Sequence, residues 1–184
     1  MPEPFSKVAI FDRDGTINVE HHYLSRPEQI ALLPGAAEGM RLLQRRGYRL
    51  VIVTNQSGIA RGYFDETRLD EIHGQLLSLL AAEGVSISGI YTCPHLPDAG
   101  CACRKPKPGL VHQAARELGF APEESLVFGD KSCDIALGRR VGATTVLVAT
   151  GHGSDTHEAG ERADIFAPSI ADAVNALFEM NVRP

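Results

Sequence analysis

Short apolar runs rich in β-branched residues alternate along this chain with segments of helical periodicity, and this alternation constrains its fold more than any other feature. Each run is short enough for one strand and lies between Gly, Pro, Asp or Asn residues. The five runs are KVAIF at 7–11, RLVIVT at 49–54, ISGIYT at 87–92, SLVFG at 125–129 and TTVLVAT at 144–150. Because alternating strands and helices build sheets that are covered on both faces, the pattern predicts an α/β fold with a doubly wound parallel sheet.

The segments between these runs carry end signals typical of helices. Asp65 is placed to cap one helix, and Pro108 suits a first helical turn. Gly47, Gly84 and Gly119 suit the left-handed residue that follows a helix. The predicted helices cover 35–47, 65–84, 108–119 and 134–142, and a final helix at 169–180 is expected to pack on the outside.

Length and composition exclude several classes of protein. The 184 residues suffice for one sizeable core, so we expect a single domain over 1–184. The net charge of -5 gives no broad basic surface for nucleic acid, and no apolar stretch approaches the ~20 residues of a membrane span. The first residues lack the pattern of a secretory signal. We therefore expect a cytoplasmic protein, monomeric in the absence of an obvious apolar patch, with neither nucleic acid nor membrane as partner.

Polar side chains follow three of the predicted strands at the point where each strand ends. Asp12 and Asp14 follow the first strand, Thr54 and Asn55 end the second, and Asp130 follows the fourth. In doubly wound sheets, ligands bind beyond the carboxyl ends of the strands. These groups are therefore expected to converge on one site.

The paired carboxylates in FDRDGTIN suit phosphoryl transfer. Asp12 is ionised near neutral pH and can attack phosphorus, which divides hydrolysis into formation and breakdown of an acyl phosphate. Asp14, two residues later, can protonate the leaving alkoxide and then activate water. Two anions beside a phosphate require positive charge nearby. Asp12, the backbone carbonyl of Asp14 and Asp130 would suit Mg²⁺.

Other residues are expected to complete this site. Lys105 supplies a second cation, while Thr54 and Asn55 can donate hydrogen bonds to phosphoryl oxygens. Asp134, one helical turn after Asp130, is expected to support the metal ligands by hydrogen bonding. Each motif taken alone is also compatible with a capped turn. Their order, each after an apolar strand, favours chemistry.

These four motifs, DxDGT, TN, the lysine of RKPKPG and GDxxxD, resemble those of the haloacid dehalogenase superfamily of aspartate-nucleophile phosphohydrolases. The resemblance spans nearly the whole chain and implies a Rossmann-like fold. It implies Asp12 as nucleophile, Asp14 as acid and base, and Asp130 as the metal-binding acid. It also implies Thr54 and Lys105 as the second and third motifs. The intervals between the motifs are filled by the helices already described, so a capless enzyme is expected.

Three cysteines and a histidine crowd into one loop at about 93–103. Cys93, His95, Cys101 and Cys103 together offer a closed tetrahedral set for Zn²⁺. The alternative is a flexible loop of free thiols, since the CxH and CxC spacing differs from common zinc knuckles. Zinc would fix the backbone that presents Arg104 and Lys105. Cys133 lies outside the loop and is expected to be a small packed side chain.

Within the superfamily, this loop resembles a branch of small capless phosphatases that act on heptose 1,7-bisphosphate, at the 7-phosphate, or on histidinol phosphate. The stretches TNQSGIARGYF, NVEHHYL and GDKSCDIALGRRVGA are closer to the heptose enzymes, which serve lipopolysaccharide core precursor synthesis, whereas CPHLP is similar to the histidinol-phosphate enzymes. Arg104 could then bind the distal phosphate of a bisphosphate. The substrate-lining residues that this resemblance implies are Glu20, His21, His22, Tyr23, Asn55, Gln56, Ser57, Arg104, Lys105 and Lys131.

Three alternatives stay open beside the heptose phosphatase. The first is a histidinol-phosphate phosphatase, and the second is a non-catalytic phosphate-binding module, which would not need both Asp12 and Asp14. The third is a nucleic-acid end phosphatase, which the acidic balance disfavours.

Four histidines are expected to lie at the surface. His21 and His22 are predicted to be a solvated loop pair rather than catalytic groups. His152 and His157 lie in a polar loop and are expected to be surface residues rather than ligands.

Overall fold

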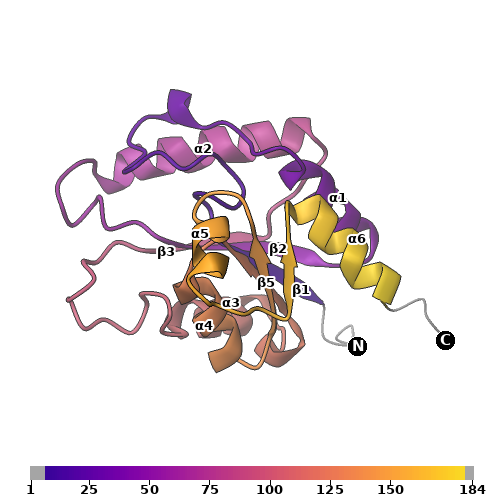
Figure 1. Ribbon diagram of the computed structural model, residues 1–184. Helices are drawn as coiled ribbons and strands as arrows, with labels where there is room; N and C mark the ends of the chain where they lie inside the picture. The colour runs from indigo at the N-terminus through magenta and orange to yellow at the C-terminus, as the bar shows by residue number, and fades with distance from the viewer. Residues whose placement is uncertain (1–6, 181–184) are drawn as a thin grey trace.

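The computed structural model describes residues 7–180, and within them a six-stranded sheet carries helices on both faces (Figure 1). Every strand pair is parallel, and the strands lie in the order β3-β2-β1-β4-β5-β6. This confirms the predicted doubly wound sheet. The strands are β1 (Val8–Phe11), β2 (Arg49–Asn55), β3 (Gly89–Cys93), β4 (Leu126–Gly129), β5 (Thr144–Val148) and β6 (Ile165–Ala167).

The helices divide between the two faces of the sheet. One face is covered by α1, α2 and α6, and the other by α3 and α4, as Figure 1 shows. Asp65 accepts a hydrogen bond from the Arg68 backbone N–H and caps α2 as predicted, whereas Pro108 immediately precedes α3 instead of starting it. The helices are α1 (Ala36–Arg45), α2 (Glu66–Ala82), α3 (Gly109–Leu118), α4 (Ser132–Arg140), α5 (Gly153–Glu158) and α6 (Ile170–Met180), with 3-10 turns η1 (Pro27–Gln29) and η2 (Pro122–Glu124).

Successive residues of the central strands enter opposite cores, because side chains alternate across a strand. In β1, Phe11 packs on the side of α1, α2 and α6, while Ile10 packs on the side of α3 and α4. The Phe11 ring stacks on Phe128 of β4 with centroids 4.7 Å apart. Full burial of side chains of this size stabilises the fold by roughly 1.5–3 kcal/mol each. The two cores therefore fix the strand from which Asp12 leaves.

Two elements were not predicted. β6 is only three residues long and pairs with β5 at the edge of the sheet, and its central Phe166 is exposed. A strand this short shows too little alternation to be recognised in a sequence. The segment expected to be a polar loop around His152 and His157 instead contains α5. Gly153, the first residue of α5, lies against the carbonyl of Val148, where a larger side chain would not fit. A contact of this kind produces no periodic pattern of apolar residues, so the helix could not be recognised from the sequence.

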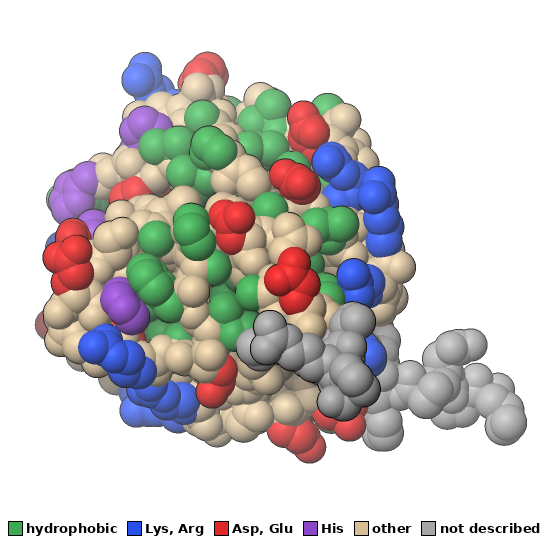
Figure 2. Space-filling model, turned by 45° about the vertical axis from the view of Figure 1, so that its right-hand side comes forward, with side chains coloured by type: hydrophobic (Ala, Val, Ile, Leu, Met, Phe, Trp, Pro, Cys, Tyr) green, Lys and Arg blue, Asp and Glu red, His purple; other side chains and the backbone are tan. Residues whose placement is uncertain are grey.

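The carboxyl ends of the strands meet at one edge of the sheet, and the segments that leave them form the candidate site. Among residues 7–180, the intervals between the strands hold only the helices and turns already given, without an inserted cap domain. None of the described helices is both long enough and apolar enough to span a bilayer. On the face in Figure 2, Lys and Arg gather in separate small groups with Asp and Glu between them, so this face carries no continuous basic stripe.

Candidate active site and metal-binding loop

A cavity of about 380 Å³ opens above the carboxyl ends of the strands. The cavity is lined by Asp12 and Asp14, which follow β1, and by Thr54 near the end of β2. It is also lined by all ten residues that were expected to surround the substrate. Those ten are Glu20, His21, His22, Tyr23, Asn55, Gln56, Ser57, Arg104, Lys105 and Lys131. Leu24, Gly58, Cys133 and His152 complete the lining. The structure thus brings the predicted motifs together around one cavity.

Asp12 is paired with Lys105 beneath this cavity. Lys105 Nζ lies 2.7 Å from Asp12 Oδ1 and 2.8 Å from Asp134 Oδ1, and it donates to the Val53 carbonyl at 2.8 Å. Burial alone would lower the pKa of Lys105, but the charges of Asp12 and Asp134 raise it above its usual value. Lys105 therefore stays protonated and places its positive charge against Asp12 beside the cavity.

Asp12, Asp130 and Asp134 converge closely enough to hold a metal ion. One carboxylate oxygen of each lies within 4.8 Å of the others, and all three residues are buried. Burial, followed by the charges of Asp12 and Asp134, raises the pKa of Asp130 to about 8. Three buried acids around one basic side chain leave excess negative charge, and a hard divalent cation with oxygen ligands would neutralise it. Both oxygens of Asp134 are engaged, by Lys105 and by the Lys131 backbone N–H, so Asp12 and Asp130 are the acids that fit Mg²⁺ as direct ligands.

The backbone around Asp130 leaves room for its carboxylate. Its Oδ2 accepts from the His152 backbone N–H at 2.9 Å, and its Oδ1 lies 3.5 Å from Thr16 Oγ1. Gly15 and Gly151 both have positive φ, +83° and +55°, and a Cβ on either would overlap this carboxylate. The glycine of the DxDGT motif therefore has two tasks: it allows the turn after β1, and it leaves space for the Asp130 carboxylate.

Asp14 lies apart from the three clustered acids. Arg13 donates to both of its carboxylate oxygens, at 2.8 to 3.2 Å, and Asn18 and Gln56 donate at 2.9 Å each. Burial raises the pKa of Asp14, but the Arg13 charge and these hydrogen bonds outweigh it and lower the pKa. Arg13 in turn contacts His73 of α2, where burial and the Arg13 charge lower the histidine pKa to about 4.

At the end of β2, the side-chain amides of Asn55 and Gln56 form hydrogen bonds to neighbouring residues of the site. Asn55 Oδ1 accepts from the Lys105 backbone N–H at 3.0 Å, and its Nδ2 donates to the Lys105 carbonyl at 3.3 Å. Gln56 Nε2 bridges Asp14 Oδ2 and Thr54 Oγ1, at 2.9 Å each. The Lys105 peptide thus engages Oδ1 and one of the two Nδ2 hydrogens, and Asn55 also lines the cavity. The expected hydrogen bond from Asn55 to a phosphoryl oxygen stays a prediction beside this positioning contact.

Glu20, Lys131 and His152 meet on one wall of the cavity. Lys131 Nζ donates to Glu20 Oε2 at 3.0 Å, and His152 Nε2 lies 4.0 Å from the same oxygen. His152 was expected to be a surface residue rather than a ligand; it is exposed, and it lines the cavity. His157 stacks on Phe166 and does not line the cavity.

Aromatic contacts build the rim of the cavity. His21 and His22 are exposed, as predicted, yet both line the cavity. The His22 ring meets Tyr23 edge to face with centroids 4.6 Å apart, and Tyr23 meets the exposed Tyr63 in the same way at 4.8 Å. The segment after β1 is thereby joined to the loop after β2.

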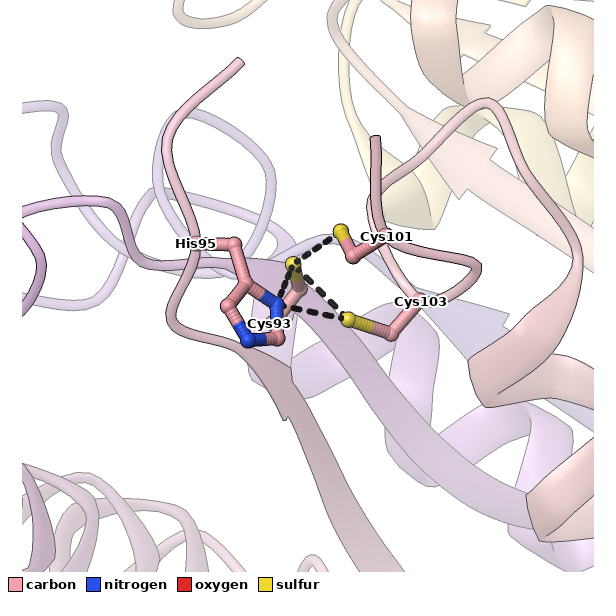
Figure 3. A group of neighbouring side chains, drawn as sticks. All are labelled: Cys93, His95, Cys101 and Cys103. Atoms are coloured by element: carbon pink, nitrogen blue, oxygen red, sulfur yellow. Dashed lines mark hydrogen bonds between the residues drawn. The ribbon is translucent and has the colours of Figure 1, made fainter. Parts of the chain in front are cut away.

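The four residues of the cysteine and histidine loop point toward one another (Figure 3). Cys93 Sγ lies 3.6 Å from His95 Nδ1, 3.7 Å from Cys101 Sγ and 3.1 Å from Cys103 Sγ, and His95 Nδ1 lies 3.1 Å from Cys103 Sγ. Ligands at ~2.3 Å from a tetrahedral ion lie about 3.8 Å apart. The four ligand atoms all lie within 4.8 Å of one another, which fits a structural Zn²⁺ site.

The loop is tied directly to the cavity. Arg104 Nη1 donates to the His95 carbonyl at 3.2 Å, and Lys105 follows in the chain. Cys133 is not part of this cluster. It is half-buried on α4 beside the cavity, and burial, followed by the Asp134 charge, raises the pKa of its thiol to about 12. Cys133 is therefore a neutral side chain of the cavity wall instead of a purely packed one.

Known proteins resemble the chain over most of its length. The HAD-hydrolase-like family model, for haloacid dehalogenase-like hydrolases, matches residues 102–173. D-glycero-β-D-manno-heptose-1,7-bisphosphate 7-phosphatase of Pasteurella multocida is 42% identical over 174 residues, which cover 90% of this chain and 94% of the relative. The enzyme of that name from Photorhabdus laumondii is 43% identical and covers 92% and 94%. The chain belongs to the heptose bisphosphate phosphatase family of the haloacid dehalogenase superfamily.

A solved structure of this family extends the likeness to three dimensions. D,D-heptose 1,7-bisphosphate phosphatase from B. bronchiseptica, complexed with magnesium and phosphate, has a TM-score of 0.88 and 33% identity. The match covers 95% of this chain and 99% of that one. The resemblance to this superfamily, stated from the four sequence motifs, is confirmed.

Several polar residues that surround Asp14 in this protein were not predicted from its sequence. Arg13 and Asn18 stand inside or beside the DxDGT motif and were not predicted as site residues, and neither was His73 of the predicted helix at 65–84. A charged residue two positions after a buried strand was a signal for Arg13. His73 carried no comparable signal, because its partner lies 60 residues away.

Proposed function

We propose that this protein hydrolyses the 7-phosphate of D-glycero-D-manno-heptose 1,7-bisphosphate through an aspartyl-phosphate on Asp12. The observation that carries the proposal is the Asp12 carboxylate, held 2.7 Å from Lys105 under a cavity lined by the residues of the family motifs. The named function of the relatives supports the substrate. A purely phosphate-binding module would have no need for both Asp12 and Asp14 beside one cavity.

In the first half-reaction, Asp12 Oδ attacks phosphorus and forms an acyl phosphate while the bond from phosphorus to the sugar oxygen breaks. In its protonated form, which the Arg13 charge and the hydrogen bonds to its carboxylate disfavour, Asp14 donates a proton to the leaving oxygen and becomes the carboxylate. In the second half-reaction, Asp14 takes a proton from a water molecule that attacks the acyl phosphate, which releases phosphate and restores Asp12. Lys105 stays in contact with Asp12 as charge moves onto the phosphoryl oxygens, and Thr54 can donate to them.

Asp12, Asp130 and the backbone carbonyl of Asp14 would hold Mg²⁺. When bound, the ion neutralises the phosphoryl group and the neighbouring carboxylates. Asp134 bonds Lys105 and the Lys131 backbone N–H, at 2.8 and 3.1 Å, so it supports this arrangement through its neighbours. The magnesium in the B. bronchiseptica structure supports this part of the proposal.

Arg104 is proposed to bind the distal phosphate of the bisphosphate. It lines the cavity and lies on the loop whose four ligands would bind Zn²⁺. Zinc there would be structural, because all four ligand positions are taken by side chains. The Zn²⁺ site thereby fixes the chain segment that carries both Arg104 and Lys105.

The proposed substrate is tested by kcat/KM in Mg²⁺ buffer. We expect heptose 1,7-bisphosphate to be preferred over histidinol phosphate. Preference for histidinol phosphate would transfer the protein to the alternative function, and an absence of phosphate release from every monoester would leave only the binding module. The β anomer is proposed as the better substrate, because two relatives named for it are 42–43% identical to this chain, whereas one named for the α anomer is 39% identical.

Four further expectations remain proposals: one domain over 1–184, a monomeric state, a cytoplasmic location and the absence of a nucleic-acid partner. The net charge of -5 supports the last. Gel filtration with light scattering tests the monomer directly.

A further inference from the structure

Arg13 is a fully buried cation between the two acids of the DxDGT motif. Its side chain is 0% exposed, and its Nε and Nη2 donate to both oxygens of Asp14. A two-point contact of this kind fixes the plane of a carboxylate as well as its position. The orientation of Asp14 therefore depends on where the Arg13 guanidinium is held.

His73 supplies the contact on the other side of that guanidinium. Its Nε2 lies 3.2 Å from Arg13 Nη1, and the residue is buried on α2. Arginine can only donate, so Nε2 must accept and the imidazole carries its proton on Nδ1. The contact thus needs a neutral histidine. Through His73, helix α2 contacts Arg13 and, by way of Arg13, the Asp14 carboxylate.

Asn18 and Gln56 complete the surroundings of Asp14 but hold it differently. Each donates one hydrogen bond, at 2.9 Å, from loops next to the site. Among the described residues, Arg13 alone contacts both oxygens, and it also reaches a helix packed in the core. The buried pair of Arg13 and His73 thus supplies the two-point contact to the carboxylate.

We propose that Arg13 and His73 are positioning residues that orient the carboxyl group of Asp14, which acts in its protonated form, for proton transfer to the leaving oxygen. The inference rests on the proposed phosphatase function and on Asp14 as its acid. It assigns a task to a buried helix residue that does not line the cavity. Loss of the His73 contact should matter most where the leaving group needs a proton.

The test compares leaving groups. A sugar alkoxide needs protonation as it departs, whereas nitrophenolate departs without it. We expect His73→Leu to lower kcat/KM about tenfold for heptose 1,7-bisphosphate, the size of one lost hydrogen bond to a charged group, and less than about twofold for p-nitrophenyl phosphate. His73→Gln offers Nη1 an amide oxygen and should restore kcat/KM to within about threefold of wild type. An equal loss on both substrates, or no loss on either, would overturn the proposal.

Two further variants separate positioning from damage to the fold. Leu69→Val changes a buried residue one turn earlier on α2 and should leave the ratio of the two kcat/KM values unchanged. Arg13→Lys keeps the charge but loses the two-point contact, so it should reproduce the leaving-group-dependent loss even if His73→Leu does not fold. A ratio unchanged in Arg13→Lys would count against the proposal.

The substrate proposal can fail separately. If the wild type prefers histidinol phosphate, the heptose assignment falls, while the same comparison on that alkyl phosphate still tests Arg13 and His73. If the wild type hydrolyses no alkyl phosphate, both proposals fall.

Discussion

The side-chain amide of Asn55 and the peptide of Lys105 exchange two hydrogen bonds, at 3.0 and 3.3 Å. Asn55 ends a central strand, and Lys105 ends the loop that carries the cysteine and histidine cluster. This contact joins the loop to the sheet at the residue whose Nζ meets Asp12. The position of Lys105 is therefore set by a strand end as well as by the loop.

Asn55→Ala removes both hydrogen bonds to the Lys105 peptide. Two neutral hydrogen bonds contribute about 1 kcal/mol each, so we expect kcat to fall about ten- to thirtyfold. Steady-state phosphate release measures the effect. Gln113→Ala, on the exposed face of α3, is the control and should keep the wild-type rate. A wild-type kcat in Asn55→Ala would show that the loop holds Lys105 without the strand.

Arg104→Ala should separate substrates with two phosphates from those with one. If Arg104 binds the distal phosphate, we expect kcat/KM to fall about 10²-fold for heptose 1,7-bisphosphate and only a few-fold for a sugar monophosphate. Arg116→Ala, an exposed arginine on α3, controls for a general loss of positive charge. A similar loss on both substrates would place Arg104 at the reacting phosphate instead.

Removal of zinc should weaken the loop and leave the core folded. Cys93 belongs to one apolar core and Cys101 and Cys103 pack against it, but both cores are built mainly from residues outside the loop. We therefore expect the far-ultraviolet circular dichroism to persist while kcat falls at least tenfold. Metal analysis before and after treatment with a chelator, followed by assay with Mg²⁺ restored, measures this. Undiminished activity in a zinc-free sample would contradict a positional role for the metal.

His73 should make stability depend on pH. Its pKa is lowered from the usual 6.5 to about 4, so its contribution is fully present above pH 6.5 and is lost as the pH falls toward 4. Between these values the unfolded chain binds the extra proton. Relative to His73→Gln, the wild type should lose on the order of 1–2 kcal/mol of unfolding free energy between pH 7 and pH 5. Urea titrations at the two pH values test this, and parallel changes in both proteins would contradict it.

Much of the sheet could be predicted from the sequence because its strands are buried on both faces. Runs such as RLVIVT show this directly, and the polar residues that end them indicated where the strands converge. β6 could not be predicted, since it has only three residues, of which Ile165 and Ala167 are buried and Phe166 is exposed. Burial of a strand on both faces produces a run of apolar residues in the sequence, whereas the backbone pairing of a short edge strand produces no such run.

The candidate site was predictable where function depends on residue type within a motif. Asp12, Asp130 and Lys105 follow this rule, and the four ligands of the loop were indicated by their clustering. Contacts that depend on the fold were not predictable. The contact between Arg13 and His73 joins residues on separate elements, and His152 reaches the cavity only because α5 begins at Gly153.

The central claim is that Asp12 transfers the phosphoryl group from the 7-position of the heptose. Phosphorus NMR of heptose 1,7-bisphosphate incubated with the wild type and with Asp12→Asn tests it most directly. In the wild type we predict that the 7-phosphate signal disappears, inorganic phosphate grows and the 1-phosphate signal remains, while Asp12→Asn leaves both ester signals intact. Loss of the 1-phosphate first, or turnover by Asp12→Asn at the wild-type rate, would contradict the claim.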